Sequence, residues 1–267
     1  MITYPNFKIN IGLFITEKRA DGFHNLETIF YPIDNCCDEL EIVPLSTGET
    51  QMTVLNTNTV TADVDNLCLK AYYLLKKDYA LPPVSITLTK NIPVGAGLGG
   101  GSSDAAFTLK MLNDLCDLKL SNSVLKEYAA QLGSDVPFFI DNTPAYATGR
   151  GEVLTPIHLD LSHKVITVVK PAFSISTAEA YQGVHPQLST VSLEETIKLP
   201  LEQWKEHIQN DFEVSLFKKY PLLKEIKELL YEKGADYVSL SGSGSALFAI
   251  ADYRIGVDFC VSNVLLP

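Results

Sequence analysis

The sequence contains only five cysteines, and no two of them form a CxxC pair. An odd number of cysteines, two of them adjacent, fits neither a disulfide framework nor a zinc site. We therefore expect reduced thiols in a reducing compartment. The cysteines are Cys36, Cys37, Cys68, Cys116 and Cys260.

Clusters of lysine or arginine are also missing, and the formal net charge is −11. A surface that binds nucleic acid or an anionic membrane needs a basic footprint, so neither partner is expected. The first residues show no basic segment followed by an apolar one, and no run approaches the roughly 18 apolar residues of a membrane span. We therefore expect a cytoplasmic protein, a monomer or weak homodimer, whose partner is a small molecule.

Hydrophobic residues make up 46% of the 267 residues and are spread along the whole chain. They are enough for a sizeable core, and this length favours two closely packed domains over one. We place the boundary at residue 160, which gives domains 1–160 and 161–267. The two halves are expected to exchange strands.

The spacing of apolar residues predicts an alternation of strands and helices. The predicted strands are residues 7–13, 40–42, 84–89, 165–169, 237–240 and 246–250. The predicted helices are residues 67–77, 102–116, 122–132, 201–217 and 222–232. In the first strand, Lys8 and Asn10 share the face opposite the apolar one.

The most informative segment is a glycine-rich loop between a predicted strand and a predicted helix, with five glycines within residues 95–101. Glycine lacks Cβ and tolerates positive φ, so this backbone curls around an anion and directs successive N–H groups at it. The following helix adds the partial positive charge of its N-terminus, which suits di- and triphosphates. A flexible loop with serine caps is the alternative. The loop consists of Pro93, Val94, Gly95, Ala96, Gly97, Leu98, Gly99, Gly100, Gly101, Ser102 and Ser103.

Three of these glycines also match the G-x-G-x-x-G fingerprint of dinucleotide-binding folds. That fingerprint needs a second strand that ends in Asp or Glu about 20 residues later, whereas here another helical segment follows. The lysine of a P-loop and the His-Arg-Asp and Asp-Phe-Gly motifs of protein kinases are absent from the sequence. The loop therefore indicates a different solution to nucleotide binding.

The loop resembles the central motif of the galactokinase, homoserine kinase, mevalonate kinase and phosphomevalonate kinase (GHMP) superfamily, with two additional glycines and Asp104. The resemblance covers essentially the whole chain. It also rests on residues 8–10, 19–24, 65–67, 133–137 and 240–245. It implies an α+β fold of two GHMP-kinase-like domains, each a mostly antiparallel sheet covered by helices, with the active site between them.

The long form of the motif is similar to that of the members that phosphorylate 4-diphosphocytidyl-2-C-methyl-D-erythritol. These use ATP to modify the 2-hydroxyl of this cytidyl diphosphate substrate in non-mevalonate isoprenoid precursor biosynthesis. The resemblance implies ATP and Mg2+, with the metal ligands unknown. The alternatives are a sister kinase that acts on homoserine, mevalonate or a sugar, and a nucleotide-binding module without catalysis.

The resemblance implies catalytic roles for two residues. Asp135 would accept the proton of the acceptor hydroxyl or orient it, and Lys8 would neutralise developing charge. Taken alone, Asp135 is also typical of a helix cap before Pro137, and Lys8 of a solvated strand face. The loop 241–245 would close near the glycine-rich loop, or form a simple hairpin turn.

The resemblance also implies binding roles. His24 would stack on and hydrogen-bond the cytosine, and Asn10 would contact the substrate. Asn66 would contact the adenine, and it is also typical of a helix cap. Tyr31 and Tyr181 would line the ribose or erythritol region.

Overall fold

The structure is a computed structural model that describes residues 1–57, 59–189, 191–257 and 260–265, with side chains up to residue 257. The chain forms two compact units built from interleaved segments. Unit 1 comprises Met1–Phe7, Cys36–Val94 and Gly99–Thr143. Unit 2 comprises Lys8–Asn35, Gly95–Leu98 and Pro144–Pro267. The single division at residue 160 stays a prediction.

Unit 1 contains a four-stranded sheet in the order β1-β4-β6-β5. Its strands are β1 (Ile2–Thr3), β4 (Glu39–Pro44), β5 (Gln51–Leu55) and β6 (Val84–Thr89). β4 pairs antiparallel with β1 and β6, whereas β5 runs parallel to β6. The alternation of the sequence buries Leu40 and Ile42 of β4 and Ile86 and Leu88 of β6.

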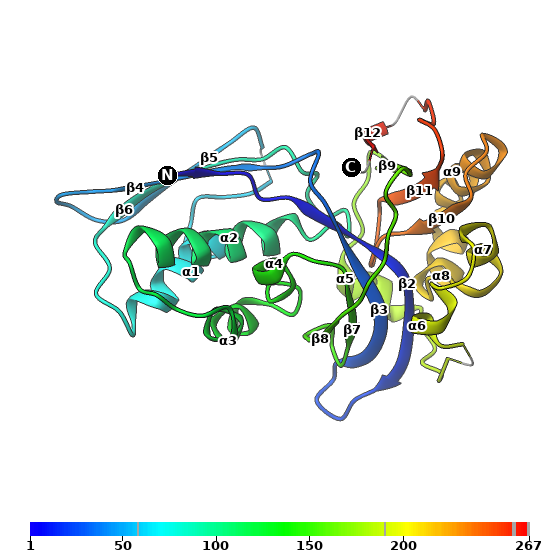
Figure 1. Ribbon diagram of the computed structural model, residues 1–267, viewed down its shortest axis with the longest axis horizontal. Helices are drawn as coiled ribbons and strands as arrows, with labels where there is room; N and C mark the ends of the chain where they lie inside the picture. The colour runs from blue at the N-terminus through cyan, green and yellow to red at the C-terminus, as the bar shows by residue number, and fades with distance from the viewer. Residues whose placement is uncertain (58, 190, 258–259, 266–267) are drawn as a thin grey trace. The chain divides into compact units, whose positions relative to one another are not determined.

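Helices cover one face of the unit 1 sheet (Figure 1). They are α1 (Leu67–Lys76), α2 (Gly100–Leu115), α3 (Asn122–Leu132) and α4 (Phe138–Asp141). Asn66 caps α1 and Ser121 caps α3 through side-chain oxygens. The central helix α2 contacts α1, α3 and α4 and buries its apolar stripe, which includes Ala105 and Leu109.

Unit 2 contains two further four-stranded sheets, in the orders β2-β3-β7-β8 and β10-β11-β9-β12. The first comprises β2 (Phe7–Lys18), β3 (His24–Ile33), β7 (Ala145–Thr148) and β8 (Val153–Pro156). The second comprises β9 (Val165–Val169), β10 (Tyr237–Leu240), β11 (Leu247–Ala251) and β12 (Cys260–Leu265). β11 pairs antiparallel with both β10 and β9, and β7 with both β3 and β8.

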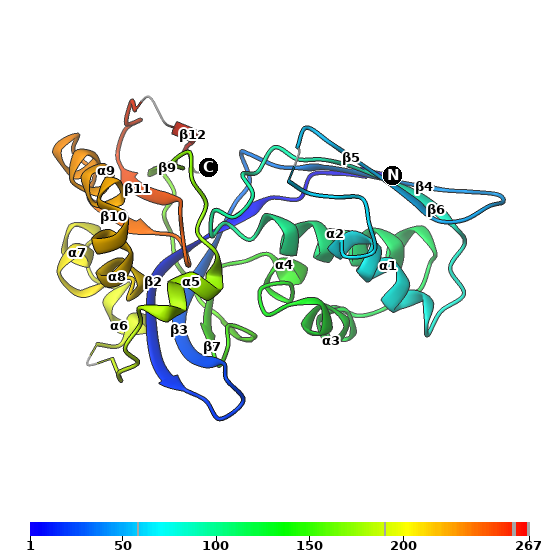
Figure 2. The same ribbon diagram turned by 180° about the vertical axis from the view of Figure 1, so that it is seen from behind.

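The helices of unit 2 follow β9 in the chain. They are α5 (Thr177–Gln182), α6 (Leu193–Thr196), the 3-10 turn η1 (Leu201–Gln203), α7 (Trp204–His207), α8 (Phe212–Lys219) and α9 (Pro221–Glu232). α9 packs against β10 and β11, and α8 packs against α9 (Figure 2). Within the described ranges, no helix has the length and apolar character that crossing a bilayer requires.

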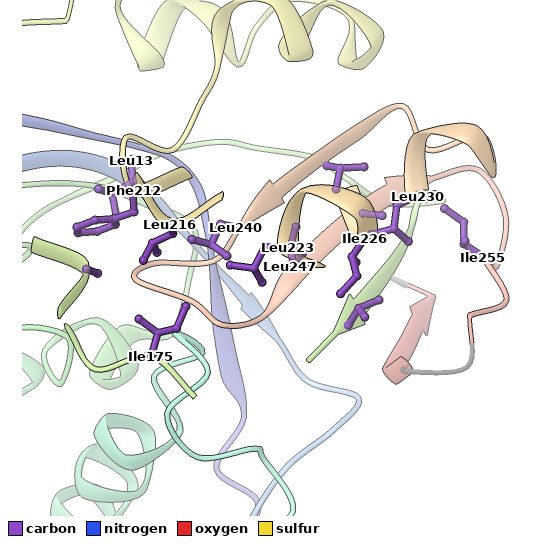
Figure 3. Packing of buried hydrophobic residues seen from close by; sticks show 14 of the residues in the cluster. Leu13, Ile175, Phe212, Leu216, Leu223, Ile226, Leu230, Leu240, Leu247 and Ile255 are labelled. Atoms are coloured by element: carbon purple, nitrogen blue, oxygen red, sulfur yellow. The ribbon is translucent and has the colours of Figure 1, made fainter. Parts of the chain in front are cut away.

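A buried hydrophobic cluster joins the strands and helices of unit 2 (Figure 3). Full burial of one such side chain contributes roughly 1.5–3 kcal/mol, so the cluster is a main source of stability for this unit. Its members include Leu13, Phe212, Leu216, Leu223, Ile226, Leu230, Leu240 and Leu247.

The structure confirms the predicted α+β class and most predicted elements. The helix at 122–132 and the strand at 84–89 have the predicted bounds. α2, however, begins at Gly100 instead of Ser102 or Ser103, because the loop ends at Gly99 in a left-handed conformation with φ of +72°. Both serines therefore lie in the first helical turn.

The predicted helix at 201–217 is interrupted. The structure has η1 followed directly by α7, and residues 208–211 separate α7 from α8. Asn210 forms a parallel β-bridge with Leu13 of β2. This pairing with a distant strand overrides the local helical spacing.

Candidate active site

The backbone of the glycine-rich loop is left-handed at three glycines. φ is +64° at Gly95, +76° at Gly97 and +72° at Gly99. α2 follows directly, and its first hydrogen bond runs from Ser103 N–H to Gly99 O at 2.9 Å. The N–H groups of residues 100–102 precede that bond and have no acceptor within the helix. Exposed donors at a helix N-terminus suit an anion such as phosphate.

A second loop, residues 241–245, lies directly against Gly97. A Cβ added to Gly97 would stand 2.0 Å from Ser241 O. The Ser241 hydroxyl donates to Gly97 O (3.0 Å), and Ala246 N–H donates to Ala96 O (3.1 Å). The same loop joins the antiparallel strands β10 and β11. It is therefore a hairpin loop that also packs on the glycine-rich loop.

Lys8 and Asn10 lie on β2 and are buried, with 3% and 2% of their surfaces exposed. Lys8 Nζ donates to Asn10 Oδ1 (2.5 Å) and Gly97 O (3.3 Å) and lies 4.8 Å from the centre of the Phe30 ring. Asn10 N–H donates to Ser241 Oγ at 3.3 Å. The alternative of a solvated strand face is therefore wrong. The side-chain oxygen of Asn10, the carbonyl of Gly97 and the ring face of Phe30 hold the ammonium inside unit 2.

The two serines of the motif do not cap α2. Its N-cap is Gly99, without a side-chain cap hydrogen bond. Ser103 is fully buried, and its Oγ has no hydrogen-bond partner among the residues that the structure describes. A buried polar group without a partner costs about 1–3 kcal/mol. A polar ligand beside Ser103 would remove this cost, which fits a phosphate or hydrated metal ion.

Three buried charged side chains connect β6 to the start of α2. Lys90 Nζ donates to Asp104 Oδ2 (2.6 Å) and forms an ion pair with Asp38. Asp38 Oδ1 accepts the backbone N–H groups of Asn91 (2.6 Å) and Ile92 (2.8 Å). This group was not predicted, because the sequence separation of 52 residues between Asp38 and Lys90 leaves no local pattern. The local signals were a lysine at the end of an alternating strand and Asp104 at the end of the glycine-rich motif.

Two carboxylates share one ammonium in this group. The pKa of Asp104 is raised to about 7, mainly by burial and also by Asp38, although Lys90 opposes the rise. Burial lowers the pKa of Lys90, but Asp104 and Asp38 together raise it above its ordinary value. The ammonium is therefore retained, and Asp104 takes up a proton more readily than an ordinary aspartate.

Asp104→Asn is expected to change how stability depends on pH. The folded protein binds the Asp104 proton more tightly than the unfolded chain does. The contribution of this proton to the free energy of unfolding is therefore greatest below about pH 4 and is lost as pH rises to about 7. A pKa raised from 3.8 to about 7 corresponds to up to about 4 kcal/mol. Urea unfolding from pH 4 to pH 8 should show the variant gaining stability relative to wild type as pH rises. The exposed Asp114→Asn on α2 is the control, and parallel curves for wild type and Asp104→Asn would contradict the assignment.

Asp135 and Asn66 belong to unit 1. Asp135 lies partly exposed in the turn between α3 and α4. The N-cap of α4 is Pro137, without a side-chain cap bond, so the cap interpretation of Asp135 gains no support. Asn66 does cap α1: its Oδ1 accepts Cys68 N–H at 2.9 Å. Its side chain is 9% exposed, which leaves little of it for a ligand.

His24 and Tyr181 lie together in unit 2. Their rings stack with centroids 4.6 Å apart and an interplanar angle of 17°, and Tyr181 meets Phe212 edge-on at 5.0 Å. Burial and the nearby Lys18 lower the pKa of His24, which favours the neutral imidazole. A neutral ring held in an aromatic stack suits contact with a planar heterocycle.

Tyr31, also on β3, lies in a different environment. Burial raises the pKa of its hydroxyl, as does Asp160, while a hydrogen bond with the backbone of Leu161 lowers it. The structure therefore brings together His24 with Tyr181, and Lys8 with Asn10 and the glycine-rich loop. Tyr31 lies instead beside residues 160 and 161.

Side chains that could ligate a metal do not cluster: within residues 1–57, 59–189 and 191–257, no group of three His, Cys, Asp or Glu could hold an ion. Cys36, Cys68 and Cys116 are free thiols, as predicted. The side chain of Cys260 lies outside the described residues. No metal-ligating residue is assigned.

Comparison with known proteins places these features in a family. Residues 66–143 match the family model of the GHMP kinases N terminal domain, and residues 192–261 match that of the GHMP kinases C terminal domain. The 4-diphosphocytidyl-2-C-methyl-D-erythritol kinase of Bacteroides fragilis (strain YCH46) is 49% identical to this chain, and that of Bacteroides thetaiotaomicron is 48% identical. Each alignment covers 94% of this chain and 92% of the relative.

A solved structure agrees. The crystal structure of a 4-(cytidine 5'-diphospho)-2C-methyl-D-erythritol kinase superposes with a TM-score of 0.76 at 32% identity, covering 94% of this chain and 90% of that one. Identity of this extent along nearly the whole chain goes far beyond a shared fold. The chain therefore belongs to the 4-diphosphocytidyl-2-C-methyl-D-erythritol kinase family of the GHMP kinases.

Proposed function

We propose that the protein transfers the γ-phosphoryl group of ATP to the 2-hydroxyl of 4-diphosphocytidyl-2-C-methyl-D-erythritol, in the synthesis of isoprenoid precursors. The observation that carries this proposal is the 49% identity to a kinase of that name over 94% of the chain. The glycine-rich loop, the buried Lys8 and the His24–Tyr181 stack support it, because each supplies a part that this reaction needs. We also propose a cytoplasmic monomer or weak homodimer that binds neither nucleic acid nor membrane, in keeping with the net charge of −11.

ATP would be bound mainly by backbone groups. Left-handed glycines and the free N–H groups at the start of α2 offer donors to the phosphates, and they bring no negative charge of their own. The buried Ser103 hydroxyl offers one more polar contact. Asn66 is proposed to contact the adenine. When bound, Mg2+ would neutralise phosphate charge, and phosphate oxygens and water are expected as most of its ligands.

The chemical step is proposed to use Lys8 and Asp135. Phosphoryl transfer depends mainly on positioning and on charge stabilisation, so one carboxylate, one ammonium and a phosphate-binding loop are sufficient. Lys8 is held by Asn10 Oδ1 and Gly97 O, which fixes its ammonium beside the carbonyl of the glycine-rich loop. Asp135 would orient the acceptor hydroxyl and take its proton.

The acceptor is proposed to be recognised by its base and its polyol separately. His24, stacked on Tyr181, would contact the cytosine, since a neutral imidazole both stacks and hydrogen-bonds. Asn10, Tyr31 and Tyr181 would contact the rest of the substrate. Because Asn10 already bonds Lys8, Ser241 and Thr28, its role would be to fix the ammonium as much as to bind the substrate.

The test of this function is a panel of acceptors with ATP and Mg2+. The cytidyl diphosphate should be phosphorylated with a kcat/KM at least ~100-fold above that of homoserine, mevalonate or galactose, because only it fills the base site. Comparable rates with an acceptor that lacks cytidine would contradict the proposal. Single-turnover phosphorylation distinguishes a slow enzyme from an inactive nucleotide-binding module, which would show no product at any enzyme concentration.

His24→Ala is expected to raise KM for the cytidyl acceptor about 10- to 100-fold, with KM for ATP nearly unchanged. Loss of a stacking ring and its hydrogen bond removes about 1.5–3 kcal/mol of binding that does not depend on the chemical step. Steady-state kinetics with each substrate varied in turn measure the effect. His24→Phe keeps the stack and should show a smaller effect, and the exposed His207→Ala is the control. An equal rise in both KM values would argue against a base contact.

A further inference from the structure

The hairpin loop 241–245 is held by a buried asparagine from another segment. Asn210 is 1% exposed and lies between α7 and α8. Its Nδ2 donates to Leu240 O and Gly242 O, both at 2.9 Å, and its Oδ1 accepts Phe212 N–H at 3.0 Å. Both N–H groups of the carboxamide are therefore used. They bind the backbone on either side of the first serine of the loop.

The segment that carries Asn210 is fixed to β2. Leu13 N–H donates to Gln209 O at 3.0 Å, and Asp211 N–H donates to Leu13 O at 2.9 Å. β2 is also the strand that carries Lys8. The position of Asn210 is therefore set relative to Lys8 through one continuous strand.

The following residues fix the base of the same hairpin. Glu213 Oε1 accepts Leu240 N–H at 2.8 Å, and its Oε2 pairs with Lys227 Nζ at 2.6 Å. Phe212, which lies between Asn210 and Glu213 in the sequence, packs into the hydrophobic cluster of unit 2 (Figure 3). Asn210 thus binds Gly242 of the loop, and both Asn210 and Glu213 bind Leu240 at the end of β10.

The geometry at Asn210 specifies an amide. Two carbonyl oxygens that face one buried side chain need two donors, and asparagine supplies both without a charge. Alanine would remove the amide donor from both carbonyls, which leaves Leu240 O with only the hydroxyl of Ser239 at 3.3 Å in a buried site. Aspartate has the same shape but, when ionised, offers only acceptors, so both carbonyls would repel it and raise its pKa.

We propose that Asn210 is a positioning residue for the binding of ATP phosphates. It fixes the loop 241–245, and that loop fixes Gly97, whose carbonyl accepts the hydroxyl of Ser241 and the ammonium of Lys8. The proposal rests on the proposed function, in which the glycine-rich loop binds ATP. Asn210 would act only through these two loops.

Kinetics of Asn210→Ala and Asn210→Asp test the proposal. Each should raise KM for ATP at least ~10-fold, because a displaced loop misplaces the phosphates. In Asn210→Asp, a protonated carboxyl regains one donor. Its kcat/KM for ATP relative to wild type should therefore recover as pH falls from 8 to 6, whereas that of Asn210→Ala should not.

A purely structural role would behave differently. Ile226 lies on α9 and belongs to the same hydrophobic cluster as Phe212. Ile226→Val and Ile226→Ala remove different amounts of packing there, and their losses in Tm should bracket the loss of Asn210→Ala. At equal loss of Tm they should leave KM for ATP unchanged. If KM for ATP rises as much in the Ile226 variants as in Asn210→Ala, or if it does not rise in Asn210→Ala, the proposal is overturned.

Hydrogen exchange in the protein without nucleotide decides the role of Asn210 independently of the reaction. Ala246 N–H bonds Ala96 O at 3.1 Å, and Gly244 N–H bonds Ser241 O at 2.9 Å. In Asn210→Ala both amides should exchange at least ~10-fold faster, with no change in β6. Unchanged exchange overturns the role of Asn210, whereas failure of the wild type to use ATP contradicts only the proposed function.

Discussion

Asp135→Asn is expected to lower kcat by about 1,000-fold while leaving the affinity for ATP within about 3-fold of wild type. Asparagine keeps the shape of the side chain but does not take the proton of the acceptor hydroxyl. Stability should change little, because Asp135 is partly exposed and asparagine keeps its size. Steady-state kcat and calorimetric binding of a non-hydrolysable ATP analogue measure the two quantities.

The size of that loss also distinguishes the two roles proposed for Asp135. A general base should lose most of its rate as asparagine, whereas a residue that only orients the hydroxyl should lose less than about 10-fold, since the amide still accepts a hydrogen bond. Ser134→Ala, in the same turn, is the control for local disturbance. Weaker ATP binding in Asp135→Asn would instead indicate a role at the nucleotide.

Elements with local signals were predictable from the sequence. The helix at 122–132 has a local sequence signal at each end. The side chain of Ser121 accepts Val124 N–H at its start, and Gly133 follows its last residue. The strand at 84–89 alternates strictly, and one of its faces is buried. The glycine-rich loop was equally clear, because five glycines in seven residues have few structural uses.

Elements that depend on distant partners were not predictable. Residues 208–211 interrupt a helical pattern because they pair with β2, almost 200 positions earlier in the sequence. The period of two on β2 suggested that Lys8 faces solvent, yet it is buried by Gly97 and Phe30 from other segments. A periodic pattern reports polarity, and it does not report whether a polar face meets water or another part of the protein.

The residues of the candidate site also divide into those that the sequence predicted and those that it did not. Residue types and spacing alone indicated a phosphate-binding loop, but the roles of Lys8, Asp135 and His24 came from the resemblance. The ion pairs of Lys90 with Asp38 and Asp104 and the contacts of Asn210 escaped both, although Asp104 itself lies in the motif. Their partners come from other segments of the chain, so no local spacing marks them.

Gly97→Ala is expected to have an effect comparable to that of Asp135→Asn, but on ATP binding and stability instead of on the chemical step. Two independent reasons apply. The φ of +76° at Gly97 is strained for any residue with a Cβ, at about 1–2 kcal/mol. The new methyl group would also lie 2.0 Å from Ser241 O, a backbone atom, so one of the two loops must move. We expect kcat/KM for ATP to fall at least ~100-fold and Tm to fall by several degrees.

Gly48→Ala separates these two reasons. Gly48 has a φ of +98° but no atom within 4 Å of an added Cβ, so this variant tests backbone strain without crowding. It should lose a similar 1–2 kcal/mol of stability and keep the KM of wild type for ATP. Moving the loop 241–245 would displace the partners of Lys8 and Asn10 as well. If Gly97→Ala instead matched Gly48→Ala in both Tm and KM, close contact between the two loops would have no part in holding the phosphates.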